Sequence, residues 1–241
     1  MNETQTQPSF NRLILGTVSV FAFAIILGES YAWWERRIPG DSAPWLSALI
    51  VNFGIALAAT LAWWKRREWG LVPPARWPQL GGPVYGAGTF LAYLPSIVVL
   101  AGAMLLGLAS PLFGVAERSF TFSNTQWLFI LVVPAVEEWA FRVGAGGYFR
   151  RICGPFWGGY MSAMLFSLVH SLPTWSRVME MKIGLLPGPL LLGLFCEILL
   201  IGSGRVLPGI ALHMACNATV VIFTVTDERW LRWLDFLYVG R

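Results

Sequence analysis

Three ionisable residues lie within six positions of one apolar stretch: Glu137, Glu138 and Arg142. Burying such a residue in a membrane costs at least about 2.5–3.5 kcal/mol on insertion scales, so it points to a function or to an ion pair. Residues four apart share a helical face, so Glu138 and Arg142 can pair and leave Glu137 without a local partner. Two adjacent carboxyl groups in a low dielectric resist ionising together. An arginine that neutralises Glu138 would therefore leave Glu137 as a general base.

The chain has two histidines, and each lies in a later apolar stretch. His170 follows Phe166 by four residues, and His213 precedes Asn217 by four, so each pair lies on one helical face. His213 and Asn217 could direct two hydrogen-bond donors at one point, as an oxyanion hole requires. His170 could share protons with a water molecule near Glu137.

Two other interpretations of these residues stay open. Glu137, His170 and His213 are adequate zinc ligands, but His-Glu-x-x-His is absent and Arg142 disfavours a cation beside Glu138. We therefore predict no cofactor, with a zinc-dependent site as the alternative. The same side chains could also be structural, because buried polar residues often bridge membrane helices.

The composition indicates that lipid is the main solvent of this chain. Of 241 residues, 56% are hydrophobic and 12% are charged, whereas soluble domains are near one-quarter charged. Trp gathers at bilayer interfaces, and the chain has 13. Basic residues form short clusters between apolar runs, as topology signals do, and no basic stripe with interleaved aromatic residues predicts nucleic-acid binding.

The apolar runs predict an all-α fold, a polytopic transmembrane helical bundle that forms a single membrane domain over residues 1–241. At about 20 residues per span, we expect about seven spans, near 13–34, 45–64, 84–112, 127–149, 156–172, 185–201 and 206–225. The tail, 227–241, alternates charged and aromatic residues and predicts a C-terminal interfacial helix. The catalytic core would occupy 127–225.

Several residues are not assigned a catalytic role. Glu197 lies in an apolar run with no partner three or four residues away, so it could be protonated, face the site or pair with a basic residue of another span. Ser203 lies between two glycines, a pattern typical of a turn rather than of a serine nucleophile. The three cysteines are interpreted as packing residues: Cys153, Cys196 and Cys216.

Three motifs follow one another on successive spans: Glu-Glu-x-x-x-Arg at 137–142, Phe-x-x-x-His at 166–170 and His-x-x-x-Asn at 213–217. Over residues 131–220 this order resembles the CAAX protease and bacteriocin-processing (CPBP, Abi) family, which includes the Ras-converting CAAX endopeptidase. The resemblance implies an intramembrane endopeptidase of glutamate type.

The resemblance also implies a role for each motif residue. Glu137 would activate water, aided by His170 and supported by Glu138 and Arg142. The oxyanion would be bound by His213 and Asn217 of the last motif. Phe166 would be a packing residue.

The expected partners are membrane lipid and a client protein or peptide, cleaved near its membrane-proximal or carboxy-terminal segment. Prenylated CAAX proteins, bacteriocin leaders and bacterial sorting tails are options, and the short loops favour the last two and a multi-pass protein of a bacterial inner membrane. A non-enzymatic transporter or scaffold is the alternative class.

Overall fold

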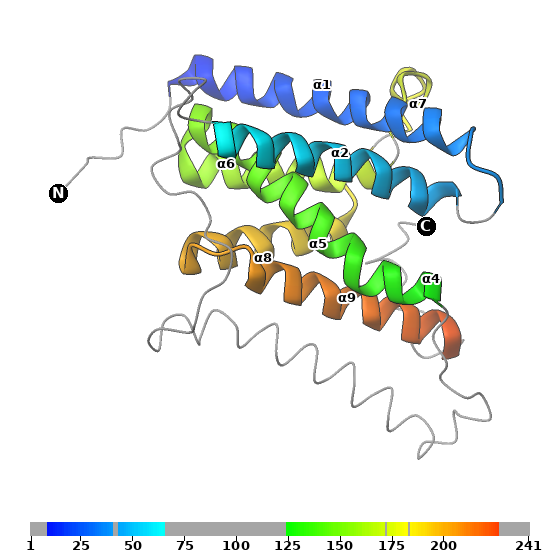
Figure 1. Cartoon of the computed structure of the whole chain (residues 1–241). Coiled ribbons are helices and arrows are strands. Elements are labelled where there is room, and N and C mark those ends of the chain that lie inside the picture. Colours follow the sequence, from blue (N-terminus) through cyan, green and yellow to red (C-terminus); the bar gives the residue numbers. More distant parts are fainter. Residues whose placement is uncertain (1–8, 41–42, 66–123, 172, 183, 227–241) are drawn as a thin grey trace.

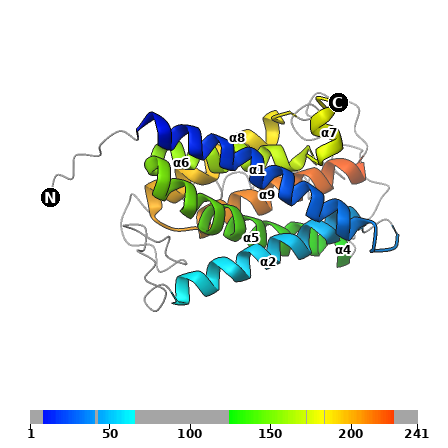
Figure 2. The ribbon, with the colours of Figure 1, turned by 90° about the horizontal axis from the view of Figure 1, so that it is seen from above.

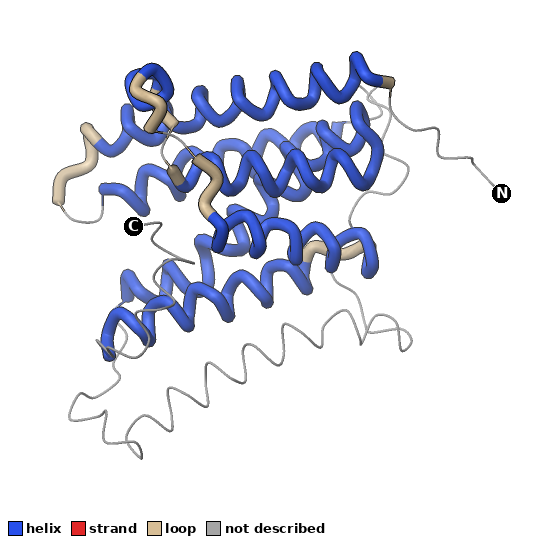
Figure 3. The backbone as a smooth tube through the Cα atoms, turned by 180° about the vertical axis from the view of Figure 1, so that it is seen from behind, coloured by secondary structure: helices blue, strands red, loops and turns tan. Residues whose placement is uncertain are grey.

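The computed structural model describes residues 9–40, 43–65, 124–171, 173–182 and 184–226. These ranges fold into helices joined by short loops and contain no strand (Figure 3). The all-α prediction is therefore confirmed for the described part of the chain. The predicted span near 84–112 and the predicted helix at 227–241 lie outside the described residues.

The helices follow the apolar runs closely. In chain order they are α1 (Phe10–Glu35), α2 (Ala43–Lys65), α4 (Asn124–Trp127), the π-helical η2 (Leu128–Val132), α5 (Val133–Glu138), the π-helical η3 (Trp139–Ala145), α6 (Gly146–His170), α7 (Trp175–Met179), α8 (Pro187–Ser203) and α9 (Leu207–Thr226). Of the described helices, only α1 is by itself long and apolar enough to cross a membrane, and shorter apolar helices cover Leu46–Leu61 and Pro187–Ser203. The number of spans stays a prediction.

The helix α6 is a hairpin rather than a straight rod. Gly154 has φ 79° and ψ 171°, outside the helical region, and Pro155 follows it. The Ser162 hydroxyl donates to the Phe141 carbonyl at 3.0 Å, although 21 residues of straight helix would separate them by about 30 Å. The chain therefore turns back at Gly154, between the two spans expected there. A side chain at Gly158 would collide with the backbone of Arg150, so the two arms pack backbone to backbone.

A second turn joins α8 to α9. Gly204 adopts a left-handed conformation (φ 67°) that ends α8, as glycine commonly does. The Ser203 hydroxyl accepts the Arg205 backbone N–H and donates to the Leu199 carbonyl. Ser203 thus has the turn role expected for it, and Pro187 begins α8 rather than breaking it.

The segment α5–η3 lies at the centre of the bundle. In Figure 1 it crosses between the α1–α2 pair and the α8–α9 pair, and Figure 2 shows it beside α2. It contacts α2 and α9 directly. α6 packs against α1 on one side and α8 on the other. Side chains of α5–η3 therefore face several helices at once.

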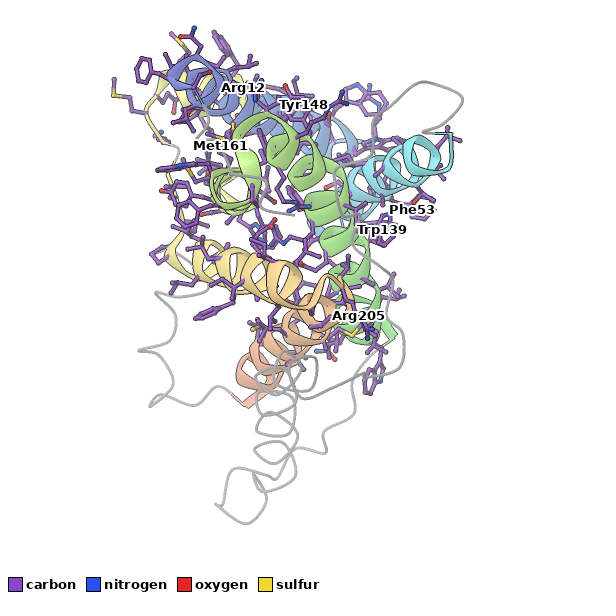
Figure 4. The ribbon with its side chains drawn as sticks, turned by 90° about the vertical axis from the view of Figure 1, so that its left-hand side faces the viewer. Arg12, Phe53, Trp139, Tyr148, Met161 and Arg205 are labelled. Carbon is purple, nitrogen blue, oxygen red and sulfur yellow. The ribbon has the colours of Figure 1, made fainter. Side chains whose placement is uncertain are left out.

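The outer surface of the bundle is apolar. Phe53 points outward from α2 (Figure 4) and is 58% exposed, and Phe156, Phe195 and Ile198 are also exposed. Soluble proteins rarely expose so many large apolar side chains. This surface is the one that lipid would cover.

Candidate active site

A π-helical segment precedes the two glutamates and creates a binding position for Asn217. In η2 the Val133 N–H bonds to the Leu128 carbonyl, five residues back. Pro134, which comes next, has no N–H to donate. The Phe129 carbonyl instead accepts a hydrogen bond from the Asn217 amide at 3.0 Å. Asn217 is thereby held by one of its two N–H groups.

The predicted ion pair between Glu138 and Arg142 is present and fully buried. Arg142 Nε lies 2.9 Å from Glu138 Oε2, and the two residues are 1% and 0% exposed. Arg142 also donates to the Ser162 hydroxyl at 3.1 Å. Because arginine stays protonated, this contact holds Glu138 as a carboxylate.

His213 lies between the two glutamates. Its Nδ1 is 3.0 Å from Glu138 Oε1, and its Nε2 is 3.6 Å from Glu137 Oε2. A carboxylate can only accept a hydrogen bond, so we assign the proton of this contact to His213 Nδ1. The arrangement resembles a histidine oriented by a buried carboxylate, with its second nitrogen directed at the reacting groups.

Glu137 has a polar partner on each carboxylate oxygen. Its Oε1 accepts a hydrogen bond from the Asn52 amide at 3.2 Å, and its Oε2 faces His213. The Asn52 carbonyl oxygen in turn accepts the Tyr31 hydroxyl at 2.9 Å. Glu137, expected to lack a local partner, is thus held by residues of α2 and α9.

His170 lies at the end of α6, beside the Phe166 ring, which also packs against His213. The Phe166 ring centroid is 4.5 Å from that of His170 and 5.6 Å from that of His213. Phe166 is fully buried, in accord with the packing role predicted for it. His170 Nδ1 contacts the Phe166 carbonyl at 2.7 Å, which leaves Nε2 available on an exposed side chain.

Glu197 belongs to a second ion pair beside the first. Its Oε2 lies 2.6 Å from Arg150 Nη1, and its Oε1 lies 3.7 Å from Arg142 Nη1. Arg150 also donates to the Arg142 carbonyl. Of the open interpretations of Glu197, pairing with a basic residue of another helix is confirmed.

Sequence reasoning missed five members of this polar network: Tyr31, Asn52, Arg150, Ser162 and, as a partner of Arg142, Glu197. Asn52 carried a usable signal, because it is a polar amide in the middle of the apolar run 45–64. The sequence singles out Glu197 but not its partners. Tyr31, Arg150 and Ser162 carried no signal, since their partners lie 20 to 47 residues away along the chain.

The described residues do not fit a three-ligand metal centre. No three His, Cys, Asp or Glu side chains within the described ranges gather as ligands. The side chains of the site are therefore considered as proton-transfer and hydrogen-bonding groups.

Comparison with known proteins yields one family. Residues 119–219 match the family model described as type II CAAX prenyl endopeptidase, Rce1-like. No curated protein and no solved structure matches the chain. The matched segment contains the three motifs and the three buried carboxylates: Glu137, Glu138 and Glu197. Together with the apolar helical bundle, the match identifies this chain as a membrane protein that carries, over residues 119–219, an Rce1-like domain of the CAAX protease family.

Proposed function

We propose that this protein is an intramembrane glutamate-type endopeptidase that cleaves a client near its membrane-proximal or carboxy-terminal segment by attack of an activated water. The observation that carries the proposal is the difference between the two buried glutamates. Glu138 is neutralised by Arg142 at 2.9 Å, whereas the partners of Glu137 among the described residues are an amide and an imidazole. When two carboxyl groups lie in different environments, one can act as the base and the other can support it. Here Glu137 would be the base and Glu138 the supporting group.

In the proposed reaction Glu137 removes a proton from water as the water oxygen bonds to the scissile carbonyl carbon. The carbonyl electrons move to oxygen and form a tetrahedral oxyanion. When this intermediate collapses, the C–N bond breaks and the proton on Glu137 passes to the leaving amine. His170, which lies near Glu137, assists these proton transfers.

The oxyanion would be stabilised by the second N–H of Asn217 and by His213 in its doubly protonated form, in which Nε2 carries a proton as well as Nδ1. Glu138 holds His213 by Nδ1, and Phe129 holds Asn217 by one N–H, so both donors are oriented before substrate binds. Such preorganised donors are worth about 2.7–4 kcal/mol each in acyl-transfer enzymes.

The substrate class is tested with three internally quenched peptides reconstituted with the purified protein in lipid. One ends in a prenylated Cys-a-a-X sequence, one contains a bacteriocin leader, and one ends in an apolar bacterial sorting tail. The family description favours the first, and the short loops of the sequence favour the other two. The peptide that the wild type cleaves becomes the probe for the variants.

The decisive variant is Glu137→Gln, which keeps the side-chain shape but cannot take a proton. We expect cleavage to fall by at least about a hundredfold, at the low end of what general-base catalysis supplies. The matched control is Glu180→Gln, the same change at an exposed residue paired with Lys182. Wild-type cleavage by folded Glu137→Gln would refute the proposal and favour a transporter or scaffold.

The zinc-dependent alternative is separated by chelation. A strong zinc chelator should leave the metal-free peptidase at its full rate. If the chelator abolishes cleavage and added Zn²⁺ restores it, Glu137, His170 and His213 would be metal ligands rather than proton-transfer groups.

A further inference from the structure

A pair of buried polar side chains lies outside the matched segment and ends on the proposed base. Tyr31 on α1 is 3% exposed and Asn52 on α2 is 1% exposed. The Tyr31 hydroxyl donates to Asn52 Oδ1 at 2.9 Å, and Asn52 Nδ2 donates to Glu137 Oε1 at 3.2 Å. The three side chains therefore form a chain of hydrogen bonds from α1 through α2 to α5.

The direction of this chain follows from its chemistry. A carboxylate has no proton to give, so only the NH₂ end of the Asn52 amide can bond to Glu137. This leaves the amide oxygen facing Tyr31, whose hydroxyl then acts as the donor. Tyr31 thus prevents the amide from flipping, and the amide holds one oxygen of Glu137.

The contact is suited to a general base. Hydrogen bonding to the charged form of a carboxyl group favours that form, and a base must be charged before it can accept the proton of water. Asn52 occupies Oε1 and directs Oε2 toward His213 Nε2, 3.6 Å away. Among the described residues, the other titratable groups near Glu137 include Tyr31, His170 and His213.

We propose that Asn52, oriented by Tyr31, is a positioning residue for Glu137, so that the active site includes the first two helices as well as the family domain. This inference rests on the proposed function, because it assigns Asn52 a task only if Glu137 is the base. It goes beyond the three motifs, which all lie within residues 119–219.

The test measures kcat, KM and the pH profile of kcat/KM for Asn52→Leu and Tyr31→Phe, with the quenched peptide that the wild type cleaves. Hydrogen bonds to charged groups predict about a ten- to hundredfold loss of kcat for Asn52→Leu, with KM unchanged. The acidic limb of the profile should move to higher pH, because Glu137 loses a donor that favours its ionised form. For Tyr31→Phe, kcat should fall about two- to tenfold, and the acidic limb should also move to higher pH.

Two further variants keep the test decisive. Tyr148→Phe is the control. It removes a hydroxyl that contacts Ser19 at 3.3 Å on the surface, so this variant should behave as the wild type. Asn52→Asp keeps the acceptor for Tyr31 but replaces the donor with a carboxylate, so it should move the acidic limb further than Asn52→Leu does. If Asn52→Leu does not accumulate, Asn52→Asp and Tyr31→Phe decide the question.

The inference is overturned if the variants at positions 52 and 31 keep the wild-type kcat and acidic limb, or if only KM or the folded fraction changes. That outcome together with an inactive Glu137→Gln leaves the proposed function standing. An active Glu137→Gln overturns the proposed function itself.

Discussion

Removing the guanidinium group of Arg142 should destabilise the whole bundle. In Arg142→Met, the carboxylate of Glu138 loses its arginine but keeps His213, and Glu197 keeps Arg150. Glu138 is 0% exposed, so water cannot replace the lost contact at 2.9 Å. Breaking a buried ion pair from one side costs about 3–5 kcal/mol. At about 2–4 °C per kcal/mol for a chain of this size, the unfolding midpoint should fall by about 6–20 °C.

A second change at Glu138 tests whether the destabilisation by Arg142→Met comes from the broken ion pair. Glu138→Gln with Arg142→Met removes both charges, and replacement of both partners of a buried pair is often nearly neutral. We expect the double variant to recover at least about 2 kcal/mol relative to Arg142→Met, within the range that coupled residues show. Cleavage should not recover with it, because His213 loses the carboxylate that orients it.

Thermal unfolding in a single detergent, followed by the fluorescence of the 13 tryptophans, measures both effects. Arg36→Met makes the same change at an exposed residue at the end of α1 and should stay within about 0.5 kcal/mol of wild type. The reasoning is refuted if Arg142→Met melts with the wild type, or if the double variant loses the sum of the two single losses.

Three other perturbations follow from the structure. Glu197→Gln leaves Arg150 without its carboxylate at 2.6 Å and should lower the unfolding midpoint by about as much as Arg142→Met, without moving the pH profile of cleavage. Asn217→Ala leaves the part-buried Phe129 carbonyl without its donor and should cost about 1–3 kcal/mol; an unchanged midpoint would argue against this contact. Gly158→Leu should prevent the α6 hairpin from closing, because even a Cβ there meets the backbone of Arg150, and protein that accumulates at wild-type level would contradict the hairpin.

Helix positions could be predicted from the sequence because they depend on local patterns. The run 13–34 became α1 (Phe10–Glu35), and the run 206–225 became α9 (Leu207–Thr226). A segment surrounded by lipid needs apolar side chains and a backbone whose hydrogen bonds are internal. Each span therefore appears in the sequence as one continuous apolar run. The pair Glu138–Arg142 was predictable for the same reason, since four-residue spacing is a property of one helix.

The partners of Glu137 and Glu197 could not be predicted. Asn52 and His213 reach Glu137 from helices that are 85 and 76 residues away along the chain, and Arg150 reaches Glu197 across 47 residues. Those contacts depend on where the chain turns back at Gly154 and on how α2 and α9 pack against α5.

The sequence by itself thus determined the helices, the apolar exterior and the seven residues of the three motifs, because each is set by neighbours within about one helical turn. Only the tertiary structure decided that His213 lies between the two glutamates and that Asn52 and Tyr31 hold the proposed base. Such contacts form because a buried polar group without a partner is costly, and the fold alone determines which partner comes within reach.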